Sequence, residues 1–192
     1  MAKLTLLTIP IGNLGDITNR VSDTLKEGGS FLVEDTRSFF HLMNALDIET
    51  TNCKVDSFHD QSDNKKIGKI ISRLNNGEDL FLLSEAGSPI ISDPAYPLVT
   101  LAIENGHKIE SYSGISAVIN ALELSGLPPC PFHFHGFSPR EKGKQTELFN
   151  SIEEISGTHI FYESPHRIIN FSSSMAKYFP NSKMVIAREL TK

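Results

Sequence analysis

Residues 82–96 read LLSEAGSPIISDPAY, and this stretch joins the end of an apolar run to a loop of small and rigid residues. The run, residues 80–83, predicts a buried strand, because a short apolar segment bounded by turn-forming residues is typical of a strand covered on both faces. The strand is expected to end at Ser84, and Gly87 and Pro89 then interrupt regular structure. In open α/β sheets ligands bind beyond the carboxyl ends of strands, so this loop is a candidate binding element.

Strand-like and helix-like segments alternate on both sides of this stretch. The predicted strands cover residues 4–9, 30–34, 54–58, 79–83 and 107–112, and the predicted helices cover residues 16–27, 36–46, 64–74, 94–104 and 115–125. Asp16 is the predicted N-cap of the first helix, and Gly28 with Gly29 is its predicted end. This alternation is typical of a mostly parallel sheet covered by helices on both faces, so the predicted fold class is α/β.

A second α/β domain is predicted after a proline-rich segment. Residues 127–131 read LPPCP and predict a linker, which separates an N-terminal domain (1–126) from a C-terminal domain (132–192). The predicted strands of the second domain cover 132–137, 158–162 and 184–188, and its predicted helices cover 144–155 and 166–178. A domain of roughly 60 residues is small for an independent core, so this domain either leans on the first or is incomplete. Because the sequence ends just after the predicted strand at 184–188, an incomplete domain is expected.

Composition excludes several classes of protein. The 192 residues are 39% hydrophobic and 21% charged, which is ordinary for a globular chain. The apolar stretch near the start, residues 4–11, is too short for a membrane span and lacks a signal-peptide pattern. Cys53 and Cys130 lie far apart without a CxxC pair, so neither a disulfide framework nor a zinc motif is predicted. We expect a cytoplasmic protein with no membrane segment.

Charge is uneven along the chain, whose formal net charge is −5. Residues 1–130 carry 10 Lys/Arg and 17 Asp/Glu, whereas residues 131–192 carry 8 and 6. An acidic chain is not typical of a nucleic-acid binder. The change of sign indicates either two regions with different partners or chance variation in surface charge, and both interpretations stay open.

The loops that follow the predicted strands hold the candidate site residues. Three of the five combine glycine with serine, asparagine or proline, which lets backbone amides approach a ligand or simply makes a tight turn. None contains a strict GxGxxG or a GxxxxGK[ST] motif, so a dinucleotide site is not favoured. The other two carry Glu34, Asp35 and Arg37, and His59. They offer either acid–base groups or a helix cap with surface side chains.

Blocks in these loops, taken in chain order, carry a family resemblance. They are TIPIGNLGDIT (8–18), EDTR (34–37), FHD (58–60), SEAGSP (84–89), GISA (114–117), FYESPHR (161–167) and ARELTK (187–192). Together they resemble the tetrapyrrole (corrin/porphyrin) methylase superfamily of S-adenosylmethionine-dependent methyltransferases, and within it the branch that methylates a ribose 2′-hydroxyl of small-subunit ribosomal RNA. The resemblance implies two α/β domains with the cofactor cleft between them. It also implies a homodimer that acts on ribosomal RNA or on the small ribosomal subunit.

The resemblance also implies roles for individual residues. The expected cofactor-binding residues are Pro10, Gly12, Ser84, Ala86, Gly87, Ser88, Gly114, Ile115, Ser116 and Ala117. The expected catalytic or substrate-contacting residues are Glu34, Asp35, Arg37, His59, Glu163, His166 and Arg167. Among these, His59 or a carboxylate would take the proton of the hydroxyl, and Arg37 and Arg167 would hold phosphates.

The residues leave further alternatives open. Arg140, Lys142 and Lys144 lie in a polar segment that is either an RNA-backbone contact or a solvated loop. No metal is predicted, since His133 and His135 share one face of a strand and are interpreted as packing residues. Phe39, Phe40, Phe161 and Tyr162 are interpreted as core residues rather than as stacking platforms for bases. A methyltransferase acting on a tetrapyrrole, and a non-catalytic relative that binds cofactor or RNA, remain alternative functions.

Overall fold

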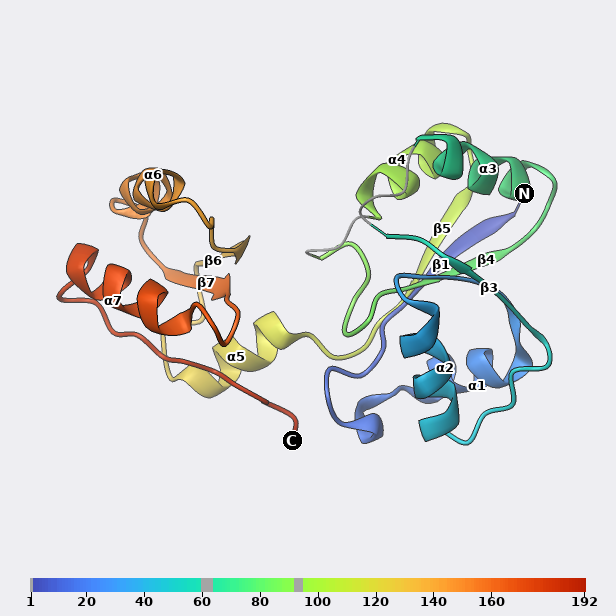
Figure 1. Cartoon of the computed structure of the whole chain (residues 1–192), viewed down its shortest axis with the longest axis horizontal. Coiled ribbons are helices and arrows are strands. Elements are labelled where there is room, and N and C mark those ends of the chain that lie inside the picture. The colour runs from blue at the N-terminus through green and yellow to red at the C-terminus, as the bar shows by residue number, and fades with distance from the viewer. Residues whose placement is uncertain (1, 60–63, 92–94) are drawn as a thin grey trace. The chain divides into compact units, whose positions relative to one another are not determined.

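The chain folds into two compact units. The computed structural model describes residues 2–59, 64–91 and 95–192, and its contacts divide the chain into a first unit, Met1–Ala117 with Thr191–Lys192, and a second unit, Val118–Leu190 (Figure 1). The division falls at Ala117 rather than at the predicted residue 126. The helix α5 (Ala117–Ser125) therefore groups with the second unit, although it precedes the prolines on which the predicted boundary rested.

The first unit is a parallel five-stranded sheet with helices on both faces. Its strands are β1 (Lys3–Leu7), β2 (Gly29–Val33), β3 (Cys53–Ser57), β4 (Leu80–Leu83) and β5 (Lys108–Tyr112), in the spatial order β3-β2-β4-β1-β5. Its α-helices are α1 (Asn19–Glu27), α2 (Thr36–Ala45), α3 (Asn64–Asn75) and α4 (Tyr96–Glu104). This confirms the predicted α/β class.

Two apolar cores explain why β4 is an uninterrupted apolar run. Helices α1 and α2 pack on one face of the sheet around Phe31 and Leu83, and α3 and α4 pack on the other face around Leu80 and Leu82 (Figure 1). Successive side chains of a strand point to opposite faces. Every position of β4 therefore packs against one of these two cores, with three residues buried and Phe81 partly buried.

The order of the strands creates a crevice at the carboxyl edge of the sheet. Strands β1 and β2 lead into α1 and α2 on one face, whereas β4, which lies between them, leads into α4 on the other face. Chains that leave adjacent strands toward opposite faces leave a crevice between their loops. The loops after β1, β2 and β4 meet there.

The predicted start of α1 at Asp16 is wrong. Residues Leu14–Asp16 form a 3₁₀ turn, η1, in which the Asn13 side chain accepts a hydrogen bond from the Gly15 amide at 3.0 Å. Ile17 is then extended, and the helix begins only after Thr18, whose hydroxyl accepts the Val21 amide at 3.3 Å. Asp16 is a sound capping residue type, but the extended residue at Ile17 separates it from the helix.

The second unit pairs β6 (Phe132–Phe137) in parallel with β7 (Thr158–Tyr162) and adds α6 (Lys142–Ile152) and α7 (Ile168–Tyr178). Its small aromatic core includes Phe149 and Phe171, whose ring centroids lie 5.9 Å apart. The predicted strand at residues 184–188 is wrong, because this segment pairs with no strand of the described chain. Its apolar residues have strand propensity, but a strand also needs a neighbour with which to form a ladder.

The predicted linker is anchored inside the second unit. The Thr158 hydroxyl donates to the Pro128 carbonyl at 2.6 Å, and the Thr158 amide donates to the Pro131 carbonyl at 3.0 Å. A side chain at Gly157 would place its Cβ only 2.5 Å from the Pro131 carbonyl oxygen, so only glycine permits this approach. The proline-rich segment is therefore hydrogen-bonded to the start of β7 and is not a free linker.

An ion-pair network ties the ends of β2, β3 and α3 together and predicts an acid-sensitive contribution to stability. Arg73 donates two hydrogen bonds to Glu78, both at 2.8 Å, and one to Asp56 at 2.7 Å, while Ser30 donates to Glu78 at 2.6 Å. The hydrogen bonds from Arg73, and then that from Ser30, lower the pKa of Glu78 to about 2. A carboxylate with a lowered pKa stabilises the fold fully above its ordinary pKa, and this stabilisation disappears as the pH falls toward 2.

Glu78→Gln is therefore expected to lower the free energy of unfolding by about 1 kcal/mol at neutral pH. The difference between wild type and variant should shrink as the pH falls from about 4.5 to about 2. Urea denaturation across this pH range measures it. A difference that stayed constant with pH would show that the ionised carboxylate is not the stabilising group.

Candidate functional site

The loops after β1 and β4 are joined by a short backbone bridge. Ile9 and Gly87 exchange two hydrogen bonds of 3.0 Å each, between the amide of one and the carbonyl of the other. Gly87 has φ +74°, and a Cβ at this position would lie 3.3 Å from Cγ2 of Ile11. Both facts favour glycine. The small residues of the opening sequence therefore serve a close approach between two neighbouring loops.

A cavity of about 480 Å³ opens beside this bridge, within the first unit. It lies against the loops after β1, β2 and β4 and against one side of α2. Its lining residues are Ile9, Pro10, Ile11, Gly12, Leu14, Val33, Glu34, Asp35, Ser38, Phe39, His41, Leu42, Ala45, Leu83, Ser84, Glu85 and Ala86. Pockets for small ligands have volumes of about 300–1,000 Å³, so this one is large enough for a cofactor or a nucleotide.

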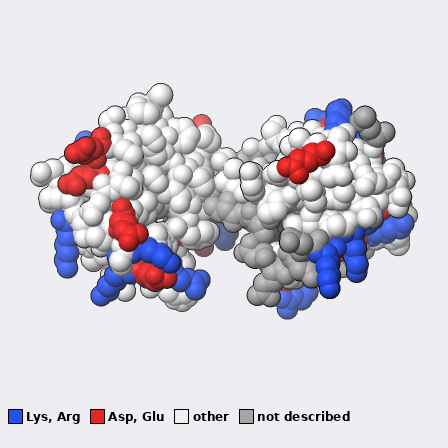
Figure 2. Space-filling view, turned by 90° about the horizontal axis from the view of Figure 1, so that it is seen from above, with Lys and Arg blue, Asp and Glu red and all other residues white. Residues whose placement is uncertain are grey.

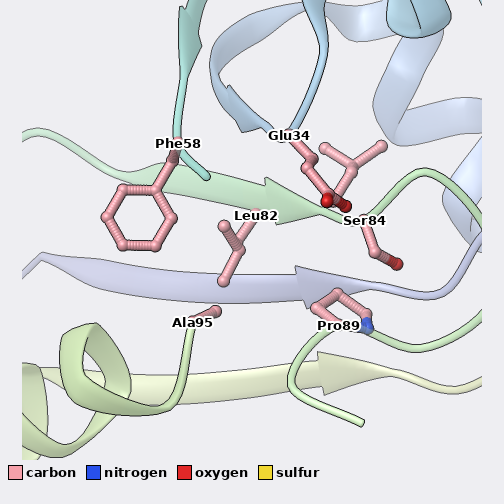
Figure 3. A pocket seen from close by; sticks show the side chains of 7 residues that line it. Glu34, Phe58, Leu82, Ser84, Pro89 and Ala95 are labelled. Atoms are coloured by element: carbon pink, nitrogen blue, oxygen red, sulfur yellow. The ribbon is translucent and has the colours of Figure 1, made fainter. Parts of the chain in front are cut away.

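A much smaller space lies between the ends of β2 and β4, with Glu34 and Ser84 in its lining. Figure 3 shows the Glu34 side chain reaching from the end of β2 toward Ser84, with Pro89 and Ala95 on the other side of this space. The Ser84 hydroxyl donates to the carbonyls of Ala86 and Gly87, at 3.2 and 3.4 Å. Ser84 thus shapes its own loop, and Glu34 lines both this space and the larger cavity.

Asp35 and Arg37 form a local pair at the start of α2. The Asp35 carboxylate caps the helix by accepting the Arg37 amide at 2.7 Å, and it also accepts the Arg37 guanidinium, with the shortest contact at 2.6 Å. These hydrogen bonds from the side chain and the amide of Arg37 lower the pKa of Asp35 to about 2. The Arg37 side chain is 89% exposed. The pair offers a fixed carboxylate and a cation facing solvent.

The structure brings six of the predicted first-unit site residues to one cavity. They are Pro10, Gly12, Glu34, Asp35, Ser84 and Ala86. Gly87 lies in the bridge beside them, while Ser88 and the exposed Arg37 and His59 are absent from the lining described here.

The loop after β5 touches the loop after β1 rather than the cavity. Gly114, Ile115, Ser116 and Ala117 are not among the residues that line the cavity in the described part of the chain. A Cβ at Gly114 would lie 2.9 Å from Cγ2 of Thr8, and the Thr8 amide donates to the Tyr112 carbonyl at 3.2 Å. A side chain at Gly114 would therefore displace the residue that precedes Ile9 and Pro10.

His166 and Arg167 lie in the second unit. His166 is exposed. Arg167 is engaged with protein acceptors, since its Nη2 donates to the Ser138 carbonyl at 2.8 Å and to Glu163 at 2.9 Å. These contacts give Arg167 a structural role, and the predicted phosphate contact stays a prediction.

The histidines of β6 and β7 form a stack. His135 lies between His159 and Phe161, with ring centroids 5.1 and 4.7 Å away, and its Nε2 is 2.9 Å from Nδ1 of His159. Burial lowers the pKa of His135. No group of three metal-ligating side chains able to hold an ion is found in the described residues. Of the aromatic residues predicted for the core, Phe39 is 4% exposed and packs on Phe31, whereas the prediction is wrong for Phe40, which is 45% exposed.

The side of α2 that faces the cavity was not predicted from the sequence. Ser38, His41, Leu42 and Ala45 line it, and the Ser38 hydroxyl donates to Glu85, another residue not predicted for the site, at 3.3 Å. The signal was present, because residues three or four apart on a helix share a face and these four continue the line from Asp35.

Among the described residues, the helices are all too short or too polar to cross a membrane.

Comparison with known proteins identifies relatives over nearly the whole chain. It is 40% identical over 189 residues to "Ribosomal RNA small subunit methyltransferase I" of Halalkalibacterium halodurans, covering 98% of this chain and 64% of that protein. The enzyme with the same name from Vibrio cholerae is 40% identical over 190 residues, with 98% and 65% covered. The chain thus spans slightly less than two thirds of the length of these relatives.

Solved structures show the same fold at low sequence identity. The methyltransferase CobJ has a TM-score of 0.67 at 14% identity, covering 93% of this chain and 77% of that one. Diphthine synthase has a TM-score of 0.65 at 14% identity, covering 91% and 73%. The family described as Tetrapyrrole (Corrin/Porphyrin) Methylases matches residues 3–192. The chain therefore belongs to the tetrapyrrole methylase family.

Proposed function

We propose that the chain is the methyl-transferring part of an S-adenosylmethionine-dependent enzyme that methylates a ribose 2′-hydroxyl of small-subunit ribosomal RNA. The observation that carries the proposal is its 40% identity, over 98% of its length, to relatives named as methyltransferases of that RNA. These relatives favour RNA over the tetrapyrrole alternative. We further expect the homodimer and the cytoplasmic location that the family resemblance and the composition predict.

The edge of the first unit fits S-adenosylmethionine. This cofactor supplies the methyl group when it is bound. Gly87 lets the loop after β4 lie close against Ile11 of the loop after β1, and the adjoining cavity of about 480 Å³ has a largely apolar lining. Pro10, Gly12, Ser84, Ala86 and Gly87 would hold the cofactor, mainly through backbone groups and close packing. The loop that contains Gly114 packs closely on Thr8 and so supports the loop after β1.

We propose that the Glu34 carboxylate is the base that takes the proton of the acceptor hydroxyl. A ribose hydroxyl is a poor nucleophile, so removal of its proton by a positioned base assists methyl transfer. Asp35 is a weak base, because its pKa of about 2 reflects a carboxylate already occupied by Arg37. Glu34 lines both the larger cavity and the smaller space between the ends of β2 and β4, where an acceptor hydroxyl could approach it. His59 remains the alternative base, and the exposed Arg37 guanidinium is suited to an RNA phosphate.

Calorimetric titration with S-adenosylmethionine and with its demethylated product tests the cofactor site. We expect both to bind one site per chain. Incubation with methyl-labelled cofactor and purified small ribosomal subunits should then label one ribose of the RNA, located by nuclease digestion and mass spectrometry. A well-folded chain that binds neither compound would contradict the proposed cofactor site, and labelling of a base would contradict the ribose assignment.

A further inference from the structure

An ion pair between the buried Glu163 carboxylate and the partly exposed Arg167 guanidinium holds together three segments of the second unit. Glu163 follows β7, and its side chain is only 4% exposed. It accepts hydrogen bonds from the Ser138 hydroxyl, from the Ser164 amide at 2.7 Å and from Arg167 at 2.9 Å. Three donors around one buried carboxylate satisfy it without solvent. Glu163 is thus a structural centre of the second unit.

The same pair fixes the segment that leaves β6. Arg167 Nη2 donates to the carbonyl of Ser138 at 2.8 Å, to its hydroxyl at 2.6 Å, and to the Pro139 carbonyl at 3.2 Å. From α6, the Gln145 side chain donates to the Pro139 carbonyl at 2.8 Å. Ser138 and Pro139 are therefore held from the start of α7 and from α6 at once.

The fixed segment runs directly into exposed cations. Arg140, Lys142 and Lys144 are all exposed, and Glu141 pairs with Lys144 at 2.9 Å. Among the described residues, no carboxylate forms an ion pair with Arg140 or Lys142. On the face of the molecule that Figure 2 shows, Lys and Arg lie in several separate groups. Arg140 and Lys142 are two single cations, so only a few phosphate contacts are expected from them.

Helix stability does not explain Lys142. Lys142 and Lys144 lie in the first turn of α6, which has no acidic residue and no side-chain cap from Glu141. The start of a helix carries partial positive charge, which disfavours cations there. A bound phosphate would offset that cost. Lys142 therefore lies where a cation costs stability, next to the segment that Glu163 and Arg167 fix. An anionic ligand explains its place better.

We infer that Glu163 and Arg167 are positioning residues, which hold Ser138 and Pro139 so that Arg140 and Lys142 contact phosphates of the RNA backbone. The inference rests on the proposed function for the identity of the polyanion. Under this inference Arg167 does not itself contact a phosphate, but positions Arg140 to do so. Because the RNA contact lies in the second unit, it is separable from cofactor binding at Gly87.

A double-mutant cycle tests the inference with an unstructured RNA oligonucleotide and with purified small ribosomal subunits. Arg140→Ala should weaken binding several-fold and reduce the slope of log affinity against log salt by about one, as expected for one lost phosphate contact. Glu163→Gln should produce a similar loss and slope. The double variant should be no weaker than Arg140→Ala alone, because the two residues act through one contact.

Ser138→Ala repeats the cycle if Glu163→Gln fails to fold, since it leaves no unpaired buried charge. Lys177→Ala removes an exposed cation from α7 and should leave affinity and slope unchanged. Additive losses in both cycles, or an unchanged salt slope, would overturn the inference, as would absence of RNA binding by the wild type. Titration with S-adenosylmethionine separately judges the proposed function, and all these variants should bind the cofactor as the wild type does.

Discussion

Gly87→Val is expected to weaken binding of S-adenosylmethionine by about 100-fold. Gly87 has φ +74°, and a β-branched residue there costs about 1–3 kcal/mol. The first added atom would also lie 3.3 Å from Ile11 Cγ2, so the branches beyond it force the loop away from its neighbour. The two hydrogen bonds with Ile9 would then be lost. The strain itself lowers stability, whereas the displacement of the loop lowers affinity. A loss of about 3 kcal/mol of binding free energy corresponds to roughly 100-fold in affinity.

Gly77→Val is the matched control. Gly77 has φ +88°, but a Cβ there meets no atom within 4 Å, and it follows α3 on the opposite edge of the sheet. Both variants should lose similar stability through backbone strain. Only Gly87→Val should lose cofactor affinity in calorimetry. If both variants bind the cofactor as the wild type does, the loop after β4 does not contact it.

The alternation of elements was predictable because it depends on burial. Strands buried on both faces must be apolar, and the helices between them carry apolar residues at helical spacing. These patterns located β1 to β5 and all the helices within a few residues. They failed at residues 184–188, where a strand was predicted but none forms. The β-prone residues there have no neighbouring strand, and pairing depends on the surrounding sheet, which a local pattern does not show.

Loop chemistry was only partly predictable, since one residue type serves several purposes. The EDTR block was open between a helix cap and catalytic groups, and the structure shows that Asp35 caps α2 while Glu34 lines the cavity. Arg167 looked like a phosphate contact because its type suits phosphates. Arg167 donates hydrogen bonds to Ser138 and Glu163, which lie 29 and 4 residues away in sequence. No sequence pattern predicts that both acceptors meet the same guanidinium.

Glu34→Gln is expected to lower kcat for methyl transfer by at least about 100-fold, the usual contribution of a general base. Glutamine keeps the size and shape of the side chain but cannot accept the proton of the hydroxyl. Affinity for S-adenosylmethionine should change little, because the expected cofactor contacts are backbone groups of the loops after β1 and β4. Single-turnover transfer to small ribosomal subunits measures the effect, and calorimetry shows that the cofactor still binds.

Asp35→Asn is the control at the neighbouring residue. Asparagine also caps helices, so α2 should persist. The Asp35 carboxylate, with its pKa of about 2, stabilises the native state above its ordinary pKa, and this is lost only in strong acid. Asp35 should therefore stay ionised between roughly pH 5 and 9, so its titration should not change kcat over that range. We expect less than about a tenfold loss of kcat, arising from the freed Arg37 guanidinium.

The two isosteric variants separate the candidate bases because they remove neighbouring carboxylates from one strand end. A large loss in Glu34→Gln with a small loss in Asp35→Asn supports Glu34 as the base. The reverse order would show that the carboxylate held by Arg37 is the reactive one, which requires RNA to displace the guanidinium seen 2.6 Å away. If both variants retain activity and His59→Gln does not, the imidazole after β3 takes the proton and Glu34 only shapes the cavity.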